Sequence, residues 1–497
     1  MSRLFKSKPK NWLLRIVVVT TILLAIVWLI LIAMSWQLFG LFRDQNFDVV
    51  GNLDGLRGGK NSMLVSSELP KLMGYEKPMT YLVVFQNTLE IRPTGGFIGS
   101  YGLITVENGK VADKFTDDIY NLDKFSEGKL NITPPLPMQK YNNQKQWYLR
   151  DANWSPDWPT SAEKILWFYE QERINAEIPD QSIDGVIAIT PQVTSDLLKL
   201  TGPITALGRT YTAENFAWDL ERFVEFDYRD QGIPFDQRKG VISEISNELI
   251  NRLEDSSVLA LFKLWPLLKR NLDQKHILVY LLDPTIQKNF SDNNWAGSIA
   301  SVNGDYLWVV DANLAALKTD GVMDKNISYD VYENDQGELV GKTVLNYKHT
   351  GEYREAMISK YRSYVRIYVP KDSWFISAYT ENQSGRNDLE ITKDFEVGDD
   401  LGRRYGATLF TVDIGQENNL VVEYRLPESV QVAYKNGLYN LFVQKQSGTV
   451  GHNLEIDLNF SKSIVAYLST EKPTNTEGNQ INWVTDLVTD RNYIVKF

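Results

Sequence analysis

The sequence has no cysteine and only three histidines among its 497 residues. Without cysteine the chain has no disulfide, no thiolate metal site and no cysteine nucleophile, so its stability has to come from the size of its hydrophobic cores. His276, His349 and His452 are far apart in the sequence, which argues against a His-rich zinc site and a histidine general base. The serine nucleophile elbow and the zinc-protease helix motif are also missing.

Acidic residues are missing from the first 43 positions, and clusters of basic residues are missing from the rest of the chain. Six of the 52 Lys and Arg residues precede Asp44, so 46 basic residues and all 63 acidic residues lie from that point onward, an excess of 17 negative charges. Nucleic acid is not an expected partner, because binding to a phosphate backbone requires clustered positive charge. The acidity suits a solvated surface.

The apolar segment Ile16–Phe42 contains no charged residue and follows a basic tail at residues 1–15. At roughly 1.5 Å per residue, a helix of this length spans the roughly 30 Å hydrocarbon layer of a membrane. The positive-inside rule keeps the tail in the cytoplasm. We therefore expect a single-pass anchor at residues 16–42, an extracytoplasmic stalk at residues 43–74 and localisation at the cell membrane. The small residues around Met34 leave a cleaved signal peptide as the alternative.

The stretch Gln86–Gly102, QNTLEIRPTGGFIGSYG, concentrates polar residues and glycines between two predicted strands. Its four glycines indicate either positive φ angles or the close approach of another group. Arg92 presents five donors that suit a carboxylate or a phosphate, and we regard it and Thr94 as candidate ligand-binding residues. The alternative is a bulged hairpin in which Arg92 pairs with Glu90.

Four sequence blocks occur in a recognisable order. They are QNTLEIRPTGGFIGSYG, DANWSPDWPTSA at residues 151–162, IDGVIAITP at residues 183–191 and LTGPI at residues 200–204. In this order they resemble an uncharacterised family of bacterial membrane-anchored envelope proteins, over roughly residues 75–319. The resemblance implies a place in the cell envelope, but no reaction.

Strands and helices alternate from residue 75 to about residue 320, which predicts a mixed α/β sheet with covering helices. Tyr306–Val310 is included as a strand of this domain. From residue 321 to residue 497, short alternating strands are separated by Gly, Asn, Asp and Pro, which predicts an all-β sandwich that serves as a binding or spacer module.

Local signals predict several element boundaries. Asn108-Gly109 is typical of a hairpin turn, and Thr190-Pro191 of the N-cap and first residue of a helix. The segment TSAE that begins at Thr160 is a capping box and predicts a second helix start. The segment Lys124–Tyr148 has little periodicity, which predicts a long surface loop.

Aromatic side chains alternate with carboxylates and an amide in the segment Trp147–Trp158. This composition resembles a sugar-binding surface, where rings stack on pyranose faces and polar groups bind the hydroxyls. Asn153, Trp154 and Trp158 are therefore candidate ligand-binding residues. The alternative is that Trp154 and Trp158 fill the core beneath the following helix.

Two adjacent carboxylates, Asp117 and Asp118, lie at the end of a predicted strand. Together with Asp236 they form a candidate site for Mg²⁺ or Ca²⁺, which prefer oxygen ligands. The alternative is that they are exposed turn residues.

A second, weaker resemblance concerns the motifs FDYRD and FDQRKGVI, which follow IDGVIAI and LTGPI. Their order is similar to that of glycopolymer transferases of the LytR-CpsA-Psr type. On this resemblance Arg229, Asp236 and Arg238 correspond to residues around the pyrophosphate of a polyprenyl carrier. The early Arg-x-Asp strand motif and the Pro-Arg-Asp motif of that family are missing, unless Arg92 substitutes for them.

Two functions are compatible with these residues. The first is the binding of an envelope glycan or a lipid-linked saccharide through the region of Trp154. The second is transfer of a glycopolymer from a polyprenyl pyrophosphate, which requires that a set of charged side chains lines one cleft. That set comprises Arg92, Arg222, Arg229, Arg238, Lys239, Asp117, Asp118 and Asp236. The alternative is that these charges are solvated pairs on helix surfaces.

Overall fold

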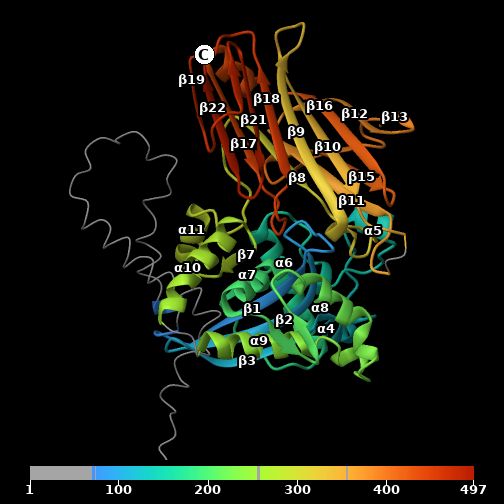
Figure 1. Cartoon of the computed structure of the whole chain (residues 1–497), viewed down its shortest axis with the longest axis vertical. Coiled ribbons are helices and arrows are strands. Elements are labelled where there is room, and N and C mark those ends of the chain that lie inside the picture. The colour runs from blue at the N-terminus through green and yellow to red at the C-terminus, as the bar shows by residue number, and fades with distance from the viewer. Residues whose placement is uncertain (1–69, 73, 255–257, 354–355) are drawn as a thin grey trace, which may run out of the picture.

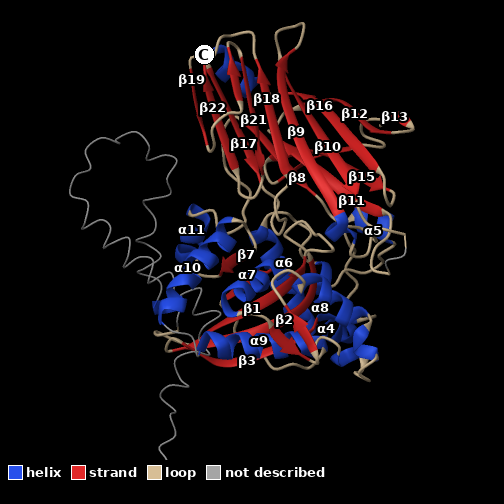
Figure 2. Cartoon of the chain, in the orientation of Figure 1, coloured by secondary structure: helices blue, strands red, loops and turns tan. Residues whose placement is uncertain are grey.

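The structure is a computed structural model that describes residues 70–72, 74–254, 258–353 and 356–497. Figure 1 shows two parts stacked along the long axis, an α/β part and a β-rich part that contains the C-terminus. Helices surround the strands of the first part, whereas the second part consists almost entirely of strands (Figure 2). The predicted order of a mixed α/β region followed by a β-rich region is confirmed.

Five strands form the sheet of the α/β part, in the order β3-β2-β1-β4-β7. β1 and β4 run parallel at its centre, and the other neighbouring strands are antiparallel. All residues of β1 except Phe85 are buried, as expected for a strand covered on both faces. The strand bounds are β1 Met79–Asn87, β2 Phe97–Glu107, β3 Lys110–Asp118, β4 Gly185–Ile189 and β7 Ile277–Leu281.

Helices cover both faces of this sheet. Helices α7 to α11 share one core with strand residues such as Val83 and Ile187. Helices α4 and α6 share the other core with the adjacent residues Leu82 and Val186. Alternate strand residues point to opposite faces, which explains this division. The helix bounds are α4 Ile119–Asp123, α5 Leu136–Asn142, α6 Trp158–Asn175, α7 Pro191–Thr201, α8 Phe216–Glu225, α9 Gly240–Glu254, α10 Val258–Asp273 and α11 Pro284–Asp292.

Short elements complete the α/β part. β5 and β6 form a small separate hairpin. Their bounds and those of the 3-10 helices are β5 Ile204–Ala206, β6 Arg209–Tyr211, η2 Lys124–Ser126, η3 Leu149–Asp151, η4 Asp227–Arg229, η5 Phe235–Gln237 and η6 Thr319–Val322.

The local boundary signals are mostly confirmed. Asn108 and Gly109 have positive φ angles in the turn between β2 and β3. α7 begins at Pro191, as predicted. The predicted capping box at Thr160 is wrong. Asp157 is the N-cap of α6, and its carboxylate accepts from the backbone N–H of Thr160 at 3.1 Å. The predicted loop Lys124–Tyr148 contains η2 and α5, which are too short to show a periodic pattern.

Two sheets pack face to face in the β-rich part. The eight-stranded sheet has the order β13-β12-β16-β10-β9-β18-β21-β20, and the seven-stranded sheet has the order β14-β15-β11-β8-β17-β22-β19. Residues of both sheets share one core, and we refer to this β-rich part as the sandwich. The bounds are β8 Asp305–Val310, β9 Met323–Glu333, β10 Leu339–His349, β11 Tyr361–Val369, β12 Trp374–Asn382, β13 Gly385–Asp388, β14 Glu396–Asp400, β15 Arg403–Val412, β16 Glu417–Arg425, α12 Glu428–Lys435, β17 Leu438–Gln444, β18 Asn453–Asn459, β19 Ala466–Ser469, β20 Asn475–Glu477, β21 Gln480–Asp486 and β22 Arg491–Lys496.

The strand β8 lies in the sandwich, although we had assigned Tyr306–Val310 to the α/β domain. It pairs in parallel with β17 and antiparallel with β11. The sandwich therefore begins before the predicted boundary at residues 320/321. The expected basic tail at residues 1–15 and the expected anchor at residues 16–42 lie outside the described residues, as does nearly all of the stalk at residues 43–74. Among the described residues, no helix is both long and apolar enough to cross a membrane.

The segment Gln444–Thr449, at the end of β17 and after it, packs against the α/β part, and its residues are all buried. Gln446 donates from Nε2 to the carbonyl of Arg92 at 3.2 Å. A Cβ atom on Gly448 would lie 2.3 Å from the Cα atom of Gly95, so both positions need glycine for the backbones to pass. The glycine-rich stretch thus permits the close approach that its composition indicated, and the approaching group is the sandwich itself.

Candidate ligand-binding site

A cavity of about 610 Å³ lies at the carboxyl ends of β1 and β4. After β1 the chain turns into β2 on one side, and after β4 it continues through α7 toward β7 on the other side. Parallel strands whose connections leave in opposite directions form a crevice at their carboxyl ends, which is the usual ligand position in open α/β sheets. The volume is within the range of small-molecule pockets.

One wall of the cavity is apolar and comes from two helices. Their lining residues recur at three- or four-residue spacing, so each helix turns one face to the cavity. They are Phe216, Leu220 and Val224 on α8 and Ile242, Ile245 and Leu249 on α9. Such a wall favours a ligand with a hydrocarbon part.

A buried guanidinium, that of Arg238, lines the cavity directly after η5. The residue is 6% exposed, and the ring of Phe235 covers its guanidinium at 3.8 Å. Its Nε atom has no hydrogen-bond partner among the described residues, and its one ion pair there is to Asp118 at 3.6 Å. Since a buried guanidinium with so few protein partners is costly, Arg238 is a candidate for contact with an anionic ligand.

Two further polar groups lie beside Arg238. Lys239 donates to the carbonyl of Gly99 and lies 2.8 Å from a carboxylate oxygen of Asp118. Burial lowers the pKa of the Lys239 ammonium, and the nearby Asp118 carboxylate offsets part of that effect. The hydroxyl of Ser100 is buried without a hydrogen-bond partner among the described residues. Two cations thus share one carboxylate, which leaves a positive excess at this end of the cavity.

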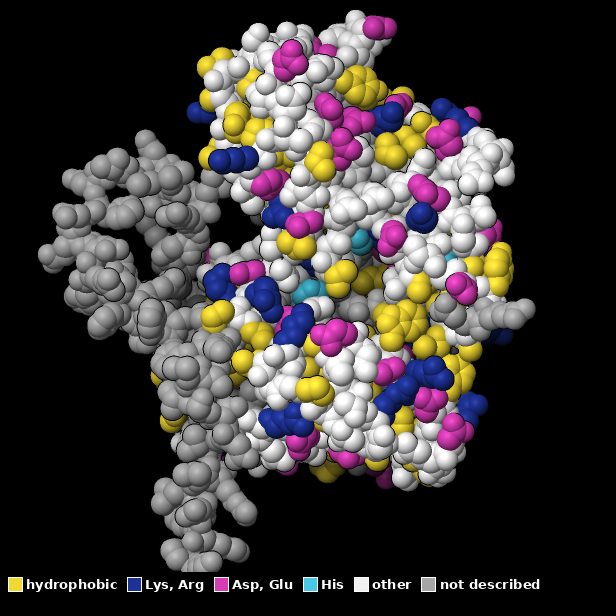
Figure 3. All heavy atoms as spheres, viewed as in Figure 1, with side chains coloured by type: hydrophobic (Ala, Val, Ile, Leu, Met, Phe, Trp, Pro, Cys, Tyr) yellow, Lys and Arg dark blue, Asp and Glu magenta, His cyan; other side chains and the backbone are white. Residues whose placement is uncertain are grey.

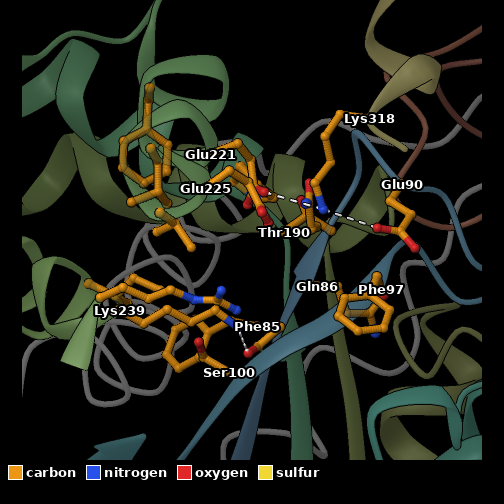
Figure 4. Close-up of a pocket in the computed structure, with 18 of the residues that line it drawn as sticks. Phe85, Gln86, Glu90, Phe97, Ser100, Thr190, Glu221, Glu225, Lys239 and Lys318 are labelled. Carbon is orange, nitrogen blue, oxygen red and sulfur yellow. Dashed lines mark hydrogen bonds and ion pairs between the residues drawn. The ribbon is translucent and has the colours of Figure 1, made fainter. Parts of the chain in front are cut away.

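The opposite end of the cavity carries carboxylates. Figure 4 shows Glu221, Glu225 and Glu90 grouped around Lys318, away from Lys239. The Lys318 ammonium lies 3.0 Å from Glu90 and 3.4 Å from Glu221. Burial acts to lower the pKa of Lys318, but the carboxylates of Glu221 and Glu90 outweigh it and raise that pKa.

Arg92 does not line the cavity. Its side chain is 3% exposed and donates to the carbonyl of Asn313, to Glu90 at 3.1 Å and to Asp151 at 3.3 Å. It therefore holds the loop after β1 against the segment that follows β8. Its pairing with Glu90 is the alternative that we considered from the sequence.

Thr94 and Asn153 are buried together behind the cavity. Asn153 donates from Nδ2 to the hydroxyl of Thr94 at 3.0 Å and to the carbonyl of Gly96 at 2.8 Å. The same hydroxyl is 3.3 Å from Nε2 of Gln86. These contacts fix the glycine-rich loop, so the two residues support the site without lining it.

The two candidate tryptophans have different positions. Trp158 is fully buried in the core beneath α6, as the core alternative predicted. Trp154 lies in a second groove of about 410 Å³ between the two parts. Its ring stacks on Tyr364 with a centroid distance of 6.0 Å, and the guanidinium of Arg366 lies 4.9 Å from its centroid. Trp154 therefore packs against the sandwich.

The three candidate metal ligands are Asp117, Asp118 and Asp236. They line a small pocket beside the main cavity, but no group of three His, Cys, Asp or Glu among the described residues is arranged to hold a metal ion. Asp118 caps α4 and pairs with Arg238 and Lys239. Asp117 accepts from the side chain of Asn121, and Asp236 is exposed. Protein donors engage Asp117 and Asp118, whereas Asp236 lies at the surface, so Mg²⁺ or Ca²⁺ at Asp117, Asp118 and Asp236 stays a prediction from the sequence.

The charged set expected for transfer chemistry only partly converges. Arg238 and Lys239 line the cavity. Arg229 is exposed and donates to the hydroxyl of Tyr228, and Arg222 is 63% exposed. On the face in Figure 3, Lys and Arg side chains are interspersed with Asp and Glu, without a large patch of one sign.

Sequence reasoning missed the acidic end of the cavity. Glu221, Glu225 and Lys318 were not among the candidate residues predicted from the sequence. The available signal was the placement of Glu221 and Glu225 four residues apart beside Leu220 and Val224, because like charges at that spacing repel each other on a helix.

Comparison with known families gives one match. Residues 76–223 match the family described as "Protein of unknown function (DUF4012)". The chain thus contains a domain of this kind, which covers β1 to most of α8 and therefore much of the cavity. No curated protein matches the chain.

Similarities to solved structures are weak. A candidate nutrient binding protein of Legionella pneumophila has 6% identity and a TM-score of 0.26, covering 39% of this chain and 71% of that one. The Lin1025 protein of Listeria innocua has 12% identity and a TM-score of 0.22, covering 47% and 85%. An M1 zinc metallopeptidase of Deinococcus radiodurans has 11% identity and a TM-score of 0.20, covering 35% and 42%, so less than half of that enzyme is matched. We draw no functional conclusion from these similarities.

Proposed function

We propose that the α/β domain binds an anionic amphiphile, with its phosphate at Arg238, Lys239 and Ser100 and its hydrocarbon chain along α8 and α9. The class that we expect is a lipid-linked saccharide or the phosphate of its lipid carrier. The protein would then act as a membrane-anchored binding component of the cell envelope.

The observation that carries this proposal is the state of Arg238. Its guanidinium is buried and makes no hydrogen bond among the described residues, and its one ion pair there joins Nε to a carboxylate oxygen of Asp118 at 3.6 Å. A phosphate supplies several acceptor oxygens that match the fork of a guanidinium. The free hydroxyl of Ser100 and the ammonium of Lys239 add two more donors at the same end of the cavity.

The apolar wall supports the amphiphilic character of the ligand. A phosphate alone would not need the helix faces that line the remainder of the cavity. Burying a hydrocarbon chain contributes about 0.8 kcal/mol for each methylene group removed from water. A ligand with both features makes use of the whole cavity.

Binding is favoured over transfer by the positions of the arginines. Transfer from a pyrophosphate would need more positive charge around the reacting phosphates, whereas Arg92 is engaged by Glu90 and Asp151 and Arg229 is exposed. We therefore propose a binding function, and we do not propose a reaction.

Equilibrium dialysis of purified full-length protein with labelled farnesyl phosphate tests the proposal. We expect farnesyl phosphate to bind at least about tenfold tighter than farnesol, because a hydrogen bond to a charged group contributes about 1.5–3 kcal/mol. Arg238→Gln should remove that difference and leave the weak binding of farnesol unchanged.

Arg229→Gln is the matched control, because Arg229 is exposed and does not line the cavity. It should bind farnesyl phosphate as the unchanged protein does. Equal affinity for farnesyl phosphate in Arg238→Gln and in the unchanged protein would contradict the proposal.

A further inference from the structure

We infer that the same cavity also recognises an ammonium group, so that its ligand is an amphiphile whose phosphate carries an aminoalkyl or amino-sugar substituent. This inference rests on the proposed function, because the phosphate would occupy the end of the cavity at Arg238. It adds a second recognition element at Glu221 and Glu225.

The two carboxylates lie one helical turn apart on α8 and line the cavity between apolar neighbours. Like charges at this spacing repel each other and destabilise a helix. Glu221 is 16% exposed, so water screens its charge only in part. The pair of Glu221 and Glu225 does not stabilise the fold unless positive charge lies near it.

Lys318 supplies too little of that positive charge. It is nearest to Glu90, at 3.0 Å, and reaches Glu221 at 3.4 Å. Glu225 has no ion-pair partner within 4 Å in the part of the chain that the structure describes. Glu90 also pairs with Arg92 at 3.1 Å, so Lys318 is the one ammonium beside Glu221 and Glu225 (Figure 4). The unpaired carboxylate, that of Glu225, faces the cavity.

An independent observation shows that this cavity is built for a polar ligand. Arg238 lines the same cavity, is 6% exposed, and has no side-chain hydrogen bond among the described residues beyond its ion pair with Asp118 at 3.6 Å. Positive excess at Arg238 and Lys239 and negative excess at Glu221 and Glu225 therefore lie at two ends of one space. A single head group with a phosphate and an ammonium is complementary to both ends.

An ammonium fits the acidic end better than a hydroxyl or a metal ion does. A hydroxyl would donate one hydrogen bond and leave the excess negative charge in place. No described group of three acidic or histidine side chains has the arrangement of a metal site. A primary ammonium provides three donors and one positive charge, which suits two neighbouring carboxylates.

The test compares two amphiphiles that differ in one group. Dodecylphosphoethanolamine and dodecyl 2-hydroxyethyl phosphate have the same chain and the same phosphodiester, but the second has a hydroxyl in place of the ammonium. Both are titrated at pH 7 into the full-length protein, below the concentrations at which they form micelles. We expect the ammonium compound to bind about tenfold tighter.

Variants of the acidic end complete the test. Glu225→Gln should reduce the preference for the ammonium compound to less than about threefold and leave the binding of the hydroxyethyl compound unchanged or slightly tighter. Glu244→Gln, an exposed residue on α9, is the matched control and should keep the full preference.

The outcomes separate this inference from the proposed function. Equal binding of the two amphiphiles, with loss of both in Arg238→Gln, would overturn the inference and leave the proposed function standing. Binding of the hydroxyethyl compound that rises with added Mg²⁺ to match the ammonium compound would assign the carboxylates to a metal ion and also overturn it. Binding of neither compound would contradict the proposed function as well.

Discussion

Arg92 and Arg238 show how the surroundings of a buried guanidinium separate a structural role from a binding role. Both side chains are less than one-tenth exposed. Arg92 donates to two carbonyls and two carboxylates within the protein, whereas the side chain of Arg238 makes no hydrogen bond among the described residues and has one ion pair there, to Asp118 at 3.6 Å. The first arginine is therefore expected to stabilise the fold, and the second is expected to stabilise a complex.

Unfolding experiments on two methionine variants distinguish these roles. Arg92→Met should lower the free energy of unfolding by about 3–5 kcal/mol, because it leaves Glu90 and Asp151 buried without one of their partners. Arg238→Met should change it by less than about 1 kcal/mol, since Lys239 remains beside Asp118. Denaturant unfolding measures both values, and equal losses in the two variants would contradict the assignment.

A second residue pair gives the stability of the protein a pH dependence. Asp123 and Glu172 are buried carboxyls that influence each other, and each has an oxygen without a donor among the described residues. Burial raises the pKa of Glu172, and the neighbouring Asp123 raises it further. The pKa of Asp123 is raised by burial as well, against the lowering effect of Arg150. A proton held between the two carboxyls satisfies both.

The sign of the pH effect follows from these raised pKa values. Above about pH 4 the unfolded chain releases a proton that the folded pair keeps, so stability falls as the pH rises, by up to about 1.4 kcal/mol per pH unit for one proton. Glu172→Gln mimics the protonated form. Its melting temperature relative to the unchanged protein should therefore rise between pH 5 and pH 8. Glu170→Gln, at a half-exposed position on the same helix, should show no such trend.

At the scale of elements, the segment Gln444–Thr449 connects the sandwich to the α/β part. Gly448 and Gly415 have similar positive φ angles, 78° and 73°, but only Gly448 has a backbone within van der Waals distance of an added Cβ. The pair therefore separates the cost of the backbone conformation from the cost of close packing.

Alanine substitution at these two glycines tests that contact. Gly415→Ala should cost only about 1–2 kcal/mol, the penalty of a left-handed conformation. Gly448→Ala should cost at least about 2 kcal/mol more, because its Cβ would lie 2.3 Å from the Cα atom of Gly95. Chemical denaturation gives both losses. A similar loss of unfolding free energy in the two variants would show that the backbones at Gly448 and Gly95 move apart for the added Cβ without a measurable cost.

The positions of strands and helices were more predictable from the sequence than the neighbouring strands with which they pair. Short alternating strands revealed the β-rich part, and turn chemistry revealed the hairpin of β2 and β3, since these signals are local. The sheet to which β8 belongs was not predictable, because its parallel neighbour β17 lies far along the chain. In the cavity, a motif pointed to Arg238. Lys318 could not be found in this way, because a loop brings it to the site and no local pattern marks it.

At the scale of the whole molecule, the cavity depends on both parts of the chain. β1, β4, α8 and α9 provide most of its lining, and Leu317 and Lys318 come from the connection after β8, a strand of the sandwich. Leu317 has a φ angle of 52°, which is unfavourable for a residue with a branched side chain and is held in place by its surroundings. The two parts are therefore expected to operate as one unit.

The contact between Gln446 and Arg92 joins positions 354 residues apart. At a synthesis rate of about 5–20 residues per second, Gln446 is synthesised about 20–70 s after Arg92, so the Arg92 carbonyl lacks this donor for that time. During that interval the loop after β1 has no Gly448 segment to pack against, and β8 has no parallel neighbour. Because the chain is synthesised from its N-terminus, the cavity cannot form completely until almost the whole sandwich has been synthesised. We expect a nascent or truncated chain to require a chaperone that covers these exposed surfaces.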